Sequence, residues 1–357
     1  MAAMMIGGEI HIDPAYAPPA GGADIAGLLD LPADRTALFG AARQAVRFWI
    51  DRFKPPGAVL LPAYCCRSVV QPYADAGVPY SYYPVDRSLR PDLGALRDMI
   101  REAGAIQAIH YFGFPAPPDL FGLGTPVLED AVQAVLSPDL RRSGAWAIGS
   151  LRKFFPVPDG AFLIAREPFA APPLPPAIGG LYGRKLYGRM RLHEAVRRGD
   201  AAAWAEALDL LAGTEDELET APVRPHAMSP GSQAALRGCA VEDMAAARRR
   251  NYTTLFDALR PVFADPARGL RPLTPELSPG VVPYGLAVLS ERRDALRAHL
   301  RSRGIYAVVH WELPDDVSRE AFPDSWWVYA RTLTLPVDHR YGAADMAEVA
   351  AAVAAFR

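Results

Sequence analysis

The sequence predicts an α/β fold: a large domain with a mostly parallel, mixed sheet flanked by helices, and a small α+β domain at the C-terminus. Three observations predict it. Short apolar segments alternate with amphipathic ones through the first half of the chain, a pattern typical of parallel sheets covered on both faces. Of the 357 residues, 50% are hydrophobic, which is enough for a large core. Beyond residue 245 a long amphipathic segment leads into a shorter pattern of strands and helices.

The first elements follow from apolar spacing. Residues 36–53 have apolar side chains at helical intervals and predict a helix. The run 58–62 predicts a buried strand, and 68–77 predicts a helix that stops at its final glycine. The aromatic run 80–85 predicts a strand, and 92–104 an amphipathic helix with a terminal glycine. Further strands are predicted over 106–112, 126–130, 145–150 and 161–165.

The second half is less regular. The segment 166–245 begins with a proline-rich stretch and contains one clear helix at 201–219. A long helix from residue 241 is expected to bridge into the small domain. We therefore expect a large domain over 1–245 and a small α+β domain over 246–357, with two helices packed against a few strands.

Composition restricts the classes of partner. The net charge of -2 and the pI near 6.4 give no support for nucleic acid or an anionic membrane as a partner. The sequence contains no run of 18 apolar residues, so it predicts no membrane span. Cys65, Cys66 and Cys239 form neither a disulfide framework nor a metal-ligand spacing. These features predict a cytoplasmic protein without a metal site.

The stretch "GSLRKFFPVPDG", residues 149–160, sets a lysine in apolar, turn-rich surroundings. Burial among such neighbours lowers the pKa of Lys153, and Arg152 acts in the same direction if it faces the same way. An amine with a lowered pKa is the group that binds an aldehyde cofactor. A solvated surface lysine is the ordinary alternative.

A pyridoxal cofactor also needs a carboxylate at its ring nitrogen and a site for its phosphate. Asp130 ends one predicted strand and Ser150 ends another, and ligands collect at the carboxyl ends of parallel strands. The helix start near Gly40 to Arg43 offers backbone amides for a phosphate. Taken singly, these residues allow ordinary roles as well: Asp130 as a helix cap, Gln133 as a solvated side chain, and Cys66 as a small buried residue.

Four motifs in order carry a family resemblance: "LPAYCCRSVVQPYADAG", "AIHYFGFPAPPD", "PVLEDAVQA" and "GSLRKFFPVPDGAFL". Together they resemble the DegT/StrS family of pyridoxal-phosphate-dependent sugar aminotransferases, of fold type I. The resemblance covers residues 35–165 well and 245–357 more weakly.

The resemblance implies a role for each matching residue. Lys153 matches the lysine that forms the internal aldimine with pyridoxal 5'-phosphate. Asp130 matches the partner of the ring nitrogen, and Gln133 the residue near the phenolic oxygen. Ser150 matches the serine that binds the phosphate.

The phosphate-binding turn and the ring-covering residue depart from the family pattern. Ala41, Ala42 and Arg43 fall on that turn, where the family has Ser-Gly followed by Thr or Arg. Cys66 falls at the position of the ring-stacking aromatic residue. Pro225 stands where the family has an asparagine that reaches the phosphate of the neighbouring subunit.

The resemblance implies an aminotransferase, a homodimer that moves an amino group from an amino-acid donor to a keto or aldehyde acceptor, which in the family is often a sugar. His310 and Trp311 lie where a predicted strand runs out into a loop, and we expect them to wall the substrate site; a packing role is the alternative. Two other functions remain open: a racemase, lyase or other pyridoxal enzyme on the same fold, and a non-catalytic relative.

Overall fold

A mixed sheet forms the centre of the computed structural model, which describes residues 5–16, 21, 23–137, 144–170, 173–176 and 179–357. Among these residues the sheet has seven strands in the order β2-β8-β7-β6-β5-β3-β4. The strands are β2 (Thr36–Phe39), β3 (Ala58–Pro62), β4 (Tyr80–Tyr83), β5 (Ala103–Ile109), β6 (Val127–Asp130), β7 (Trp146–Ser150) and β8 (Ala161–Ala165). Strand β8 is antiparallel to both neighbours, and the other pairs are parallel. The predicted mostly parallel sheet is therefore confirmed.

Apolar layers cover both faces of this sheet. The helices α2 (Ala42–Phe53) and α3 (Arg67–Ala76) pack on one face, where Phe39, Trp49 and Tyr73 are fully buried. On the other face Phe162 and Leu151 join a separate cluster. Burial on both faces explains why the strands read as continuous apolar runs in the sequence.

The less regular segment forms a helical hairpin of α5 (Gly179–Arg198) and α6 (Ala201–Thr220). The predicted helix 201–219 is confirmed as α6, whereas α5 was not predicted. Asp200 caps α6 by accepting hydrogen bonds from the amides of Ala202 and Ala203. The C-terminal end of α6 is attached to α3, because the Gln71 amide donates to the carbonyls of Leu218, Glu219 and Ala221. The hairpin thus lies against the large sheet domain.

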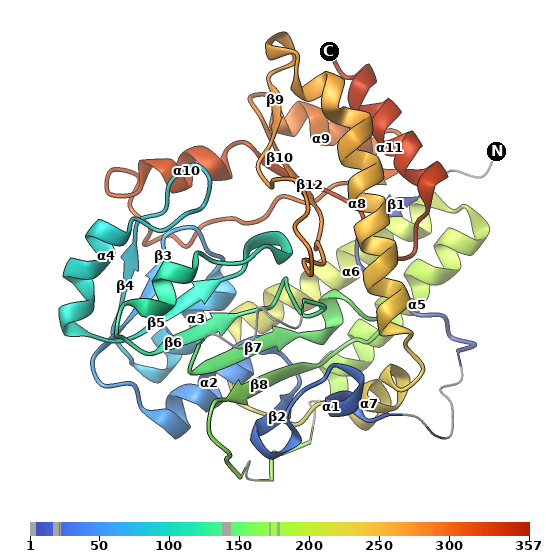
Figure 1. Cartoon of the computed structure of the whole chain (residues 1–357). Coiled ribbons are helices and arrows are strands. Elements are labelled where there is room, and N and C mark those ends of the chain that lie inside the picture. Colours follow the sequence, from blue (N-terminus) through green and yellow to red (C-terminus); the bar gives the residue numbers. More distant parts are fainter. Residues whose placement is uncertain (1–4, 17–20, 22, 138–143, 171–172, 177–178) are drawn as a thin grey trace.

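The C-terminal unit is a small α+β layer, as predicted. It contains α8 (Val241–Phe263), α9 (Arg293–Arg301), α11 (Ala343–Ala355) and a sheet of β9 (Leu270–Pro272), β10 (Leu286–Ser290) and β12 (Thr332–Leu335). Figure 1 shows α8 and α11 side by side above the large sheet. The remaining short elements are α1 (Ile25–Leu28), α4 (Leu93–Met99), α7 (Pro230–Leu236), α10 (Pro323–Tyr329), β1 (Ile6–Gly7) and β11 (Ile305–Tyr306).

The N-terminal segment joins the C-terminal unit, because β1 pairs in parallel with β11. Residues near the N-terminus therefore pack with the C-terminal unit, and α8 spans the expected boundary at residue 245. The division into 1–245 and 246–357 stays a prediction. Among the described residues, no helix has both the length and the apolar character needed to cross a bilayer.

Three predicted elements differ from the structure by three residues or more at an end. The predicted strand 106–112 runs from Ala103 to Ile109 as β5, and Tyr111–Gly113 forms a 3-10 turn. The predicted helix 36–53 begins at Ala42, because Thr36–Phe39 forms β2 and pairs with β8. The predicted helix 92–104 ends at Met99, followed by a short 3-10 turn, and β5 begins at Ala103. Gly104 is a strand residue and not a helix cap: a Cβ there would lie 2.0 Å from the carbonyl oxygen of Pro56.

Candidate functional site

Backbone hydrogen bonds join the turn that carries Lys153 to the start of α2. After β7 the chain makes a 3-10 turn over Leu151–Lys153. The amide of Leu151 donates to Gly160 (2.9 Å), and the amide of Gly160 donates to Gly40 (2.8 Å). The amide of Gly40 in turn donates to the carbonyl of His226 (3.1 Å). The predicted lysine and the predicted phosphate turn are therefore neighbours.

Lys153 lies among aromatic rings. Its Nζ is 5.8 Å from the ring centroid of Tyr284 and 5.9 Å from that of Trp311. Burial lowers the pKa of the Lys153 amine, and Arg152 lowers it further, while the nearby Cys66 and Asp130 act in the opposite direction. An amine in these surroundings loses its proton more readily than a surface lysine does.

Asp130 ends β6 beside the end of β7, and its carboxylate is buried. One carboxylate oxygen accepts from the Gln107 amide (2.8 Å) and the other from the backbone amide of Val132 (3.1 Å). Burial raises the pKa of Asp130, and these two donors and Lys153 partly oppose that shift. No helix follows in residues 131–137, so Asp130 is not a helix cap.

Gln133 is buried, and among the described residues only one of the two polar atoms of its side-chain amide has a hydrogen-bond partner. Its Oε1 accepts from the backbone amide of Phe112 (2.8 Å), but its buried Nε2 has no hydrogen-bond partner among the described residues. A buried donor without an acceptor is costly, so such a group calls for explanation. A bound ligand with an acceptor oxygen at this place would satisfy it.

The turn before α2 offers backbone donors instead of hydroxyl groups. Ala41 is the N-cap of α2 and Ala42 its first residue, and neither has a capping side chain. The first amides of a helix have no acceptor within the helix. The Arg43 side chain turns toward α3, where it donates to Gln71 (3.0 Å) and Ser68 (3.1 Å). Ser150 is buried at the end of β7.

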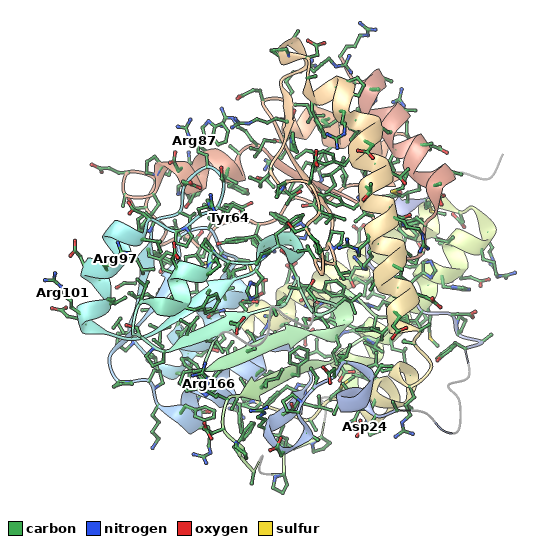
Figure 2. The ribbon with its side chains drawn as sticks, viewed as in Figure 1. Asp24, Tyr64, Arg87, Arg97, Arg101 and Arg166 are labelled. Atoms are coloured by element: carbon green, nitrogen blue, oxygen red, sulfur yellow. The ribbon has the colours of Figure 1, made fainter. Side chains whose placement is uncertain are left out.

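Cys66 is the N-cap of α3 and is half-buried. Its thiol interacts electrostatically with Lys153, Asp130 and Arg43, so the structure brings these four predicted residues together. Tyr64 lies two residues before Cys66. It is fully buried and donates to the carbonyl of His310, in the interior of the molecule (Figure 2).

A cavity of about 520 Å³ extends from Lys153 along the boundary with the C-terminal unit. His310 and Trp311 both line it, as does Tyr284. Trp311 lies parallel to Phe112 at 6.2 Å, and His310 shares a hydrogen bond with Thr334 (2.9 Å). Burial, together with Lys153, lowers the pKa of His310 to about 3, so this ring is neutral at pH 7.

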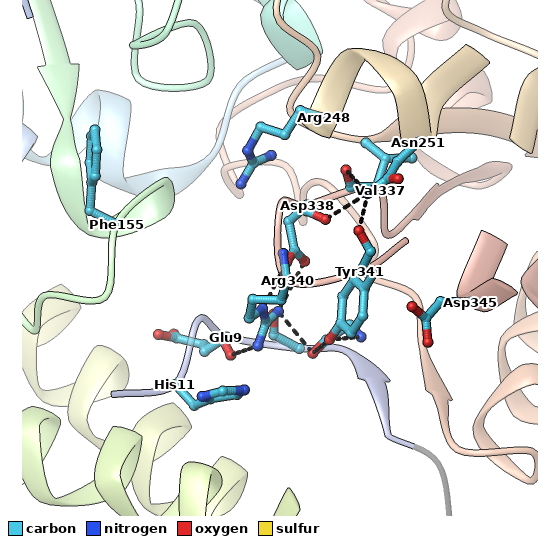
Figure 3. A network of polar contacts seen from close by, with 12 residues as sticks. Glu9, His11, Phe155, Arg248, Asn251, Val337, Asp338, Arg340, Tyr341 and Asp345 are labelled. Atoms are coloured by element: carbon cyan, nitrogen blue, oxygen red, sulfur yellow. Dashed lines mark hydrogen bonds and ion pairs between the residues drawn. The ribbon is translucent and has the colours of Figure 1, made fainter. Parts of the chain in front are cut away.

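Residues of the N-terminal segment and of the C-terminal unit also line this cavity, among them Glu9 and Asp338. Figure 3 shows Glu9 of the N-terminal segment near Asp338 and Arg340. Arg340 forms an ion pair with Asp338 (2.7 Å) and donates to the carbonyl of Glu9 (3.0 Å). A different cavity, of about 470 Å³, lies near the first residues of β7 and does not contain Lys153.

Sequence reasoning missed four residues of the site: Gln107, Glu215, His226 and Tyr284. Gln107 lies inside β5, where it resembles an ordinary strand residue. His226 contacts the Gln44 amide of α2 (2.6 Å), and Glu215 reaches Arg152 (2.7 Å). All four reach the site through tertiary contacts. Only His226 stands beside a residue of a family motif, Pro225, and no motif or spacing in the sequence marks the other three.

The sequence matches no protein-family model and no curated protein. Solved structures do match. An aminotransferase TlmJ from Streptoalloteichus hindustanus is 20% identical with a TM-score of 0.63, covering 92% of this chain and 87% of that one. A DegT DnrJ EryC1 StrS aminotransferase from Brucella abortus is 18% identical with a TM-score of 0.59, covering 90% and 85%.

A third structure is the PLP-form of the sugar aminotransferase Spr1654 from Streptococcus pneumoniae. It is 12% identical with a TM-score of 0.66, and the match covers 95% of this chain and 92% of that one. The match extends over nearly the whole length in each case. The chain therefore has the fold of the DegT/StrS-type aminotransferases, fold type I, as the resemblance in its sequence implied.

Proposed function

We propose that this protein is a pyridoxal-phosphate-dependent aminotransferase of the DegT/StrS type, which moves an amino group from an amino-acid donor to a keto or aldehyde acceptor. The observation that carries the proposal is the meeting of Lys153 and Asp130. The buried carboxylate of Asp130 ends β6, and the half-buried Lys153, whose pKa is lowered, follows the neighbouring β7 and lines a cavity of about 520 Å³. A sugar is the proposed acceptor class, because Spr1654 is described as a sugar aminotransferase.

The residues present fit pyridoxal 5'-phosphate. The unpartnered Nε2 of Gln133 is a donor for the phenolic oxygen. Asp130 is the partner for the ring nitrogen, where its carboxylate is stabilised by Gln107. The first amides of α2 at Ala42 and Arg43, together with Ser150, are the donors for the phosphate. Cys66 is the proposed neighbour of the ring face.

When bound, the cofactor supplies an electron-withdrawing ring that acidifies the α-carbon of the amino donor. Lys153 would hold the cofactor covalently until the amino group of the donor displaces it. Its freed Nζ would then carry a proton between the α-carbon of the donor and the cofactor, as general base and acid. The carboxylate of Asp130 keeps a proton on the ring nitrogen. Trp311 and Tyr284 exclude water from the amine by covering it. His310 and Trp311 are the proposed wall for the acceptor.

Covalent labelling tests this proposal. The purified protein with added pyridoxal 5'-phosphate is expected to absorb near the visible edge, and borohydride is expected to fix the cofactor to the peptide that contains Lys153. Mass spectrometry of the digest locates the label, and Lys153→Ala is the control that should take none. A label on another lysine, or no label, would contradict the assignment. Production of a keto acid from glutamate, measured with a coupled assay, then tests amino transfer itself.

We also propose that the protein is a homodimer, on the basis of the family resemblance. We propose that it is cytoplasmic, because its three cysteines are free. Light scattering on the protein with bound cofactor measures the mass. A stable monomer that binds the cofactor would contradict the dimer and leave the proposed chemistry intact.

A further inference from the structure

Three cations from three separate segments converge on one carboxylate beside Lys153. Glu215, in α6, forms ion pairs with Arg152 of the lysine turn (2.7 Å), with Arg43 of the first turn of α2 (3.5 Å) and with Lys185 of α5. The side chains of Arg43 and Lys185 are only 6% and 8% exposed. This is a buried cation cluster and not a set of surface pairs.

The surrounding charges leave the cluster with an excess of positive charge. Arg189 and Glu9 form the adjacent ion pair, which makes four cations against two carboxylates. Glu219 is solvent-exposed and accepts from Ser68. Burial and the neighbouring Arg152 lower the pKa of Lys185 to about 8, as expected where buried like charges repel one another. The carboxylate of Glu215 therefore does not neutralise the cluster, and the cluster would bind an oxyanion of a ligand favourably.

The position of the cluster connects it to the proposed site. Arg152 and Glu215 line the cavity that contains Lys153. Arg43 belongs to the first turn of α2, where the positive end of the helix dipole adds to the same potential. A ligand at Lys153 thus meets Glu215 and Arg152 at the cavity wall.

Glu215 is the member of the cluster that can most easily move away. Its side chain is 25% exposed, more than Arg152 at 16%, so water can solvate it once it turns outward. Its helix is held independently, because Gln71 binds the carbonyls of Leu218, Glu219 and Ala221. The carboxylate can therefore leave without displacing α6.

We propose that Arg43, Arg152 and Lys185 form an oxyanion-binding site, which the Glu215 carboxylate occupies in the free chain and yields to a phosphate or carboxylate group of a ligand. The site itself is independent of the proposed function. Only the source of the oxyanion rests on the proposed function. That source is either the phosphate of the cofactor or the carboxylate of the amino donor.

Calorimetric titration of the cofactor-free full chain with inorganic phosphate tests the site. Glu215→Gln keeps the shape of the side chain and removes its charge, so it is expected to bind phosphate at least tenfold more tightly than the parent. Lys185→Gln is expected to bind at least tenfold more weakly. Glu217→Gln and Arg184→Gln are matched controls, since that ion pair is exposed on the same hairpin, and both should bind like the parent.

Three ligands then distinguish the source of the oxyanion. If the cofactor phosphate is the ligand, Glu215→Gln strengthens binding of pyridoxal 5'-phosphate but not of pyridoxal. If the donor carboxylate is the ligand, the same variant strengthens binding of succinate. Either result supports the site. Unchanged or weaker binding of both phosphate and succinate by a folded Glu215→Gln would overturn it, and would make Glu215 a structural clamp.

Failure of the proposed function would look different. In that case phosphate would still bind more tightly to Glu215→Gln, whereas borohydride would label no peptide containing Lys153. If Glu215→Gln does not fold, Lys185→Gln in the otherwise unchanged chain keeps the inference testable. Full phosphate affinity in that variant would overturn it.

Discussion

At the scale of single residues, the site depends on buried groups whose charge is set by their surroundings. Lys153 has a lowered pKa and Asp130 a raised one, in both cases chiefly because burial disfavours the charged form. A protonated ring nitrogen beside Asp130 would reverse this balance and hold the carboxylate ionised. The proposed role of Asp130 is therefore electrostatic and separable from anchoring the cofactor.

Asp130→Asn tests that separation. The variant is expected to retain the cofactor, because the phosphate donors and Lys153 are unchanged. Its reaction with glutamate should slow by about 10²–10⁴-fold, since a neutral amide cannot keep the ring nitrogen protonated. Stopped-flow absorbance of the bound cofactor measures this rate. A variant that is fully loaded and reacts at nearly the parental rate would move the role to another residue.

The site residues that the sequence could propose are those with chemistry in a motif. Lys153, Asp130, Gln133 and Ser150 come from short segments at strand ends, and parallel strands bring such ends to one edge of the sheet. Tyr284 and Glu215 come from distant segments that carry no motif. Their approach to Lys153 depends on tertiary packing, which single-sequence patterns do not encode.

At the scale of elements, the turn before α2 shows why boundaries were less predictable than element types. The apolar residues of Thr36–Phe39 fit the helical spacing of 36–53, yet they pair with β8, more than 120 positions away. A local pattern cannot distinguish these outcomes when the partner strand decides between them. The actual helix start at Ala42 matters, because it places the first amides of α2 beside the lysine turn.

Gly40 is expected to be essential to this turn. A Cβ at Gly40 would lie 2.3 Å from Cε1 and 2.7 Å from Nδ1 of His226, a ring held by Gln44. Gly40→Ala should therefore displace the turn, cost about 1–3 kcal/mol of unfolding free energy and weaken cofactor binding. Urea denaturation and cofactor titration measure the two effects.

Gly122→Ala is the matched control, because a Cβ there meets nothing within 4 Å. Parental stability and cofactor affinity in Gly40→Ala would show that His226 moves aside freely. The turn would then not depend on this contact.

At the scale of the whole molecule, the N-terminal segment and the C-terminal unit together line the cavity. The backbone of Gly7 is bound to the Tyr341 hydroxyl (2.7 Å) across 334 positions of sequence. Figure 3 shows the loop around Arg340 next to the N-terminal segment. The sequence predicted the small α+β unit and six of the seven described strands of the large sheet, whereas β2 was predicted as part of a helix. It did not predict this closure, because neither segment carries a pattern that indicates the other.

This closure buries histidines, which links stability to pH. The pKa is lowered to about 3 for His310 and to about 4 for His11 and His339, in each case chiefly by burial. The ordinary value of 6.5 applies when the chain unfolds. Between these values the unfolded chain binds protons that the folded chain does not. Stability is therefore lost as pH falls below 6.5, and it is fully present above that value.

The contribution of His310 alone can be isolated. Between pH 7.5 and pH 5.0, His310 should lower the free energy of unfolding by about 2 kcal/mol. At pH 5.0 the unfolded chain protonates this ring, whose pKa is then 6.5, whereas the folded chain, with a pKa of about 3, does not. His310→Gln retains a partner for Thr334 and cannot titrate, so its stability should fall less between the two pH values, by about that amount. Urea denaturation of both proteins at each pH provides the comparison, and it does not depend on the absolute stability of the variant. Equal losses of unfolding free energy in the two proteins would mean that His310 is protonated in the folded state and donates to Thr334. The cavity beside Lys153 would then be more polar than its lining indicates.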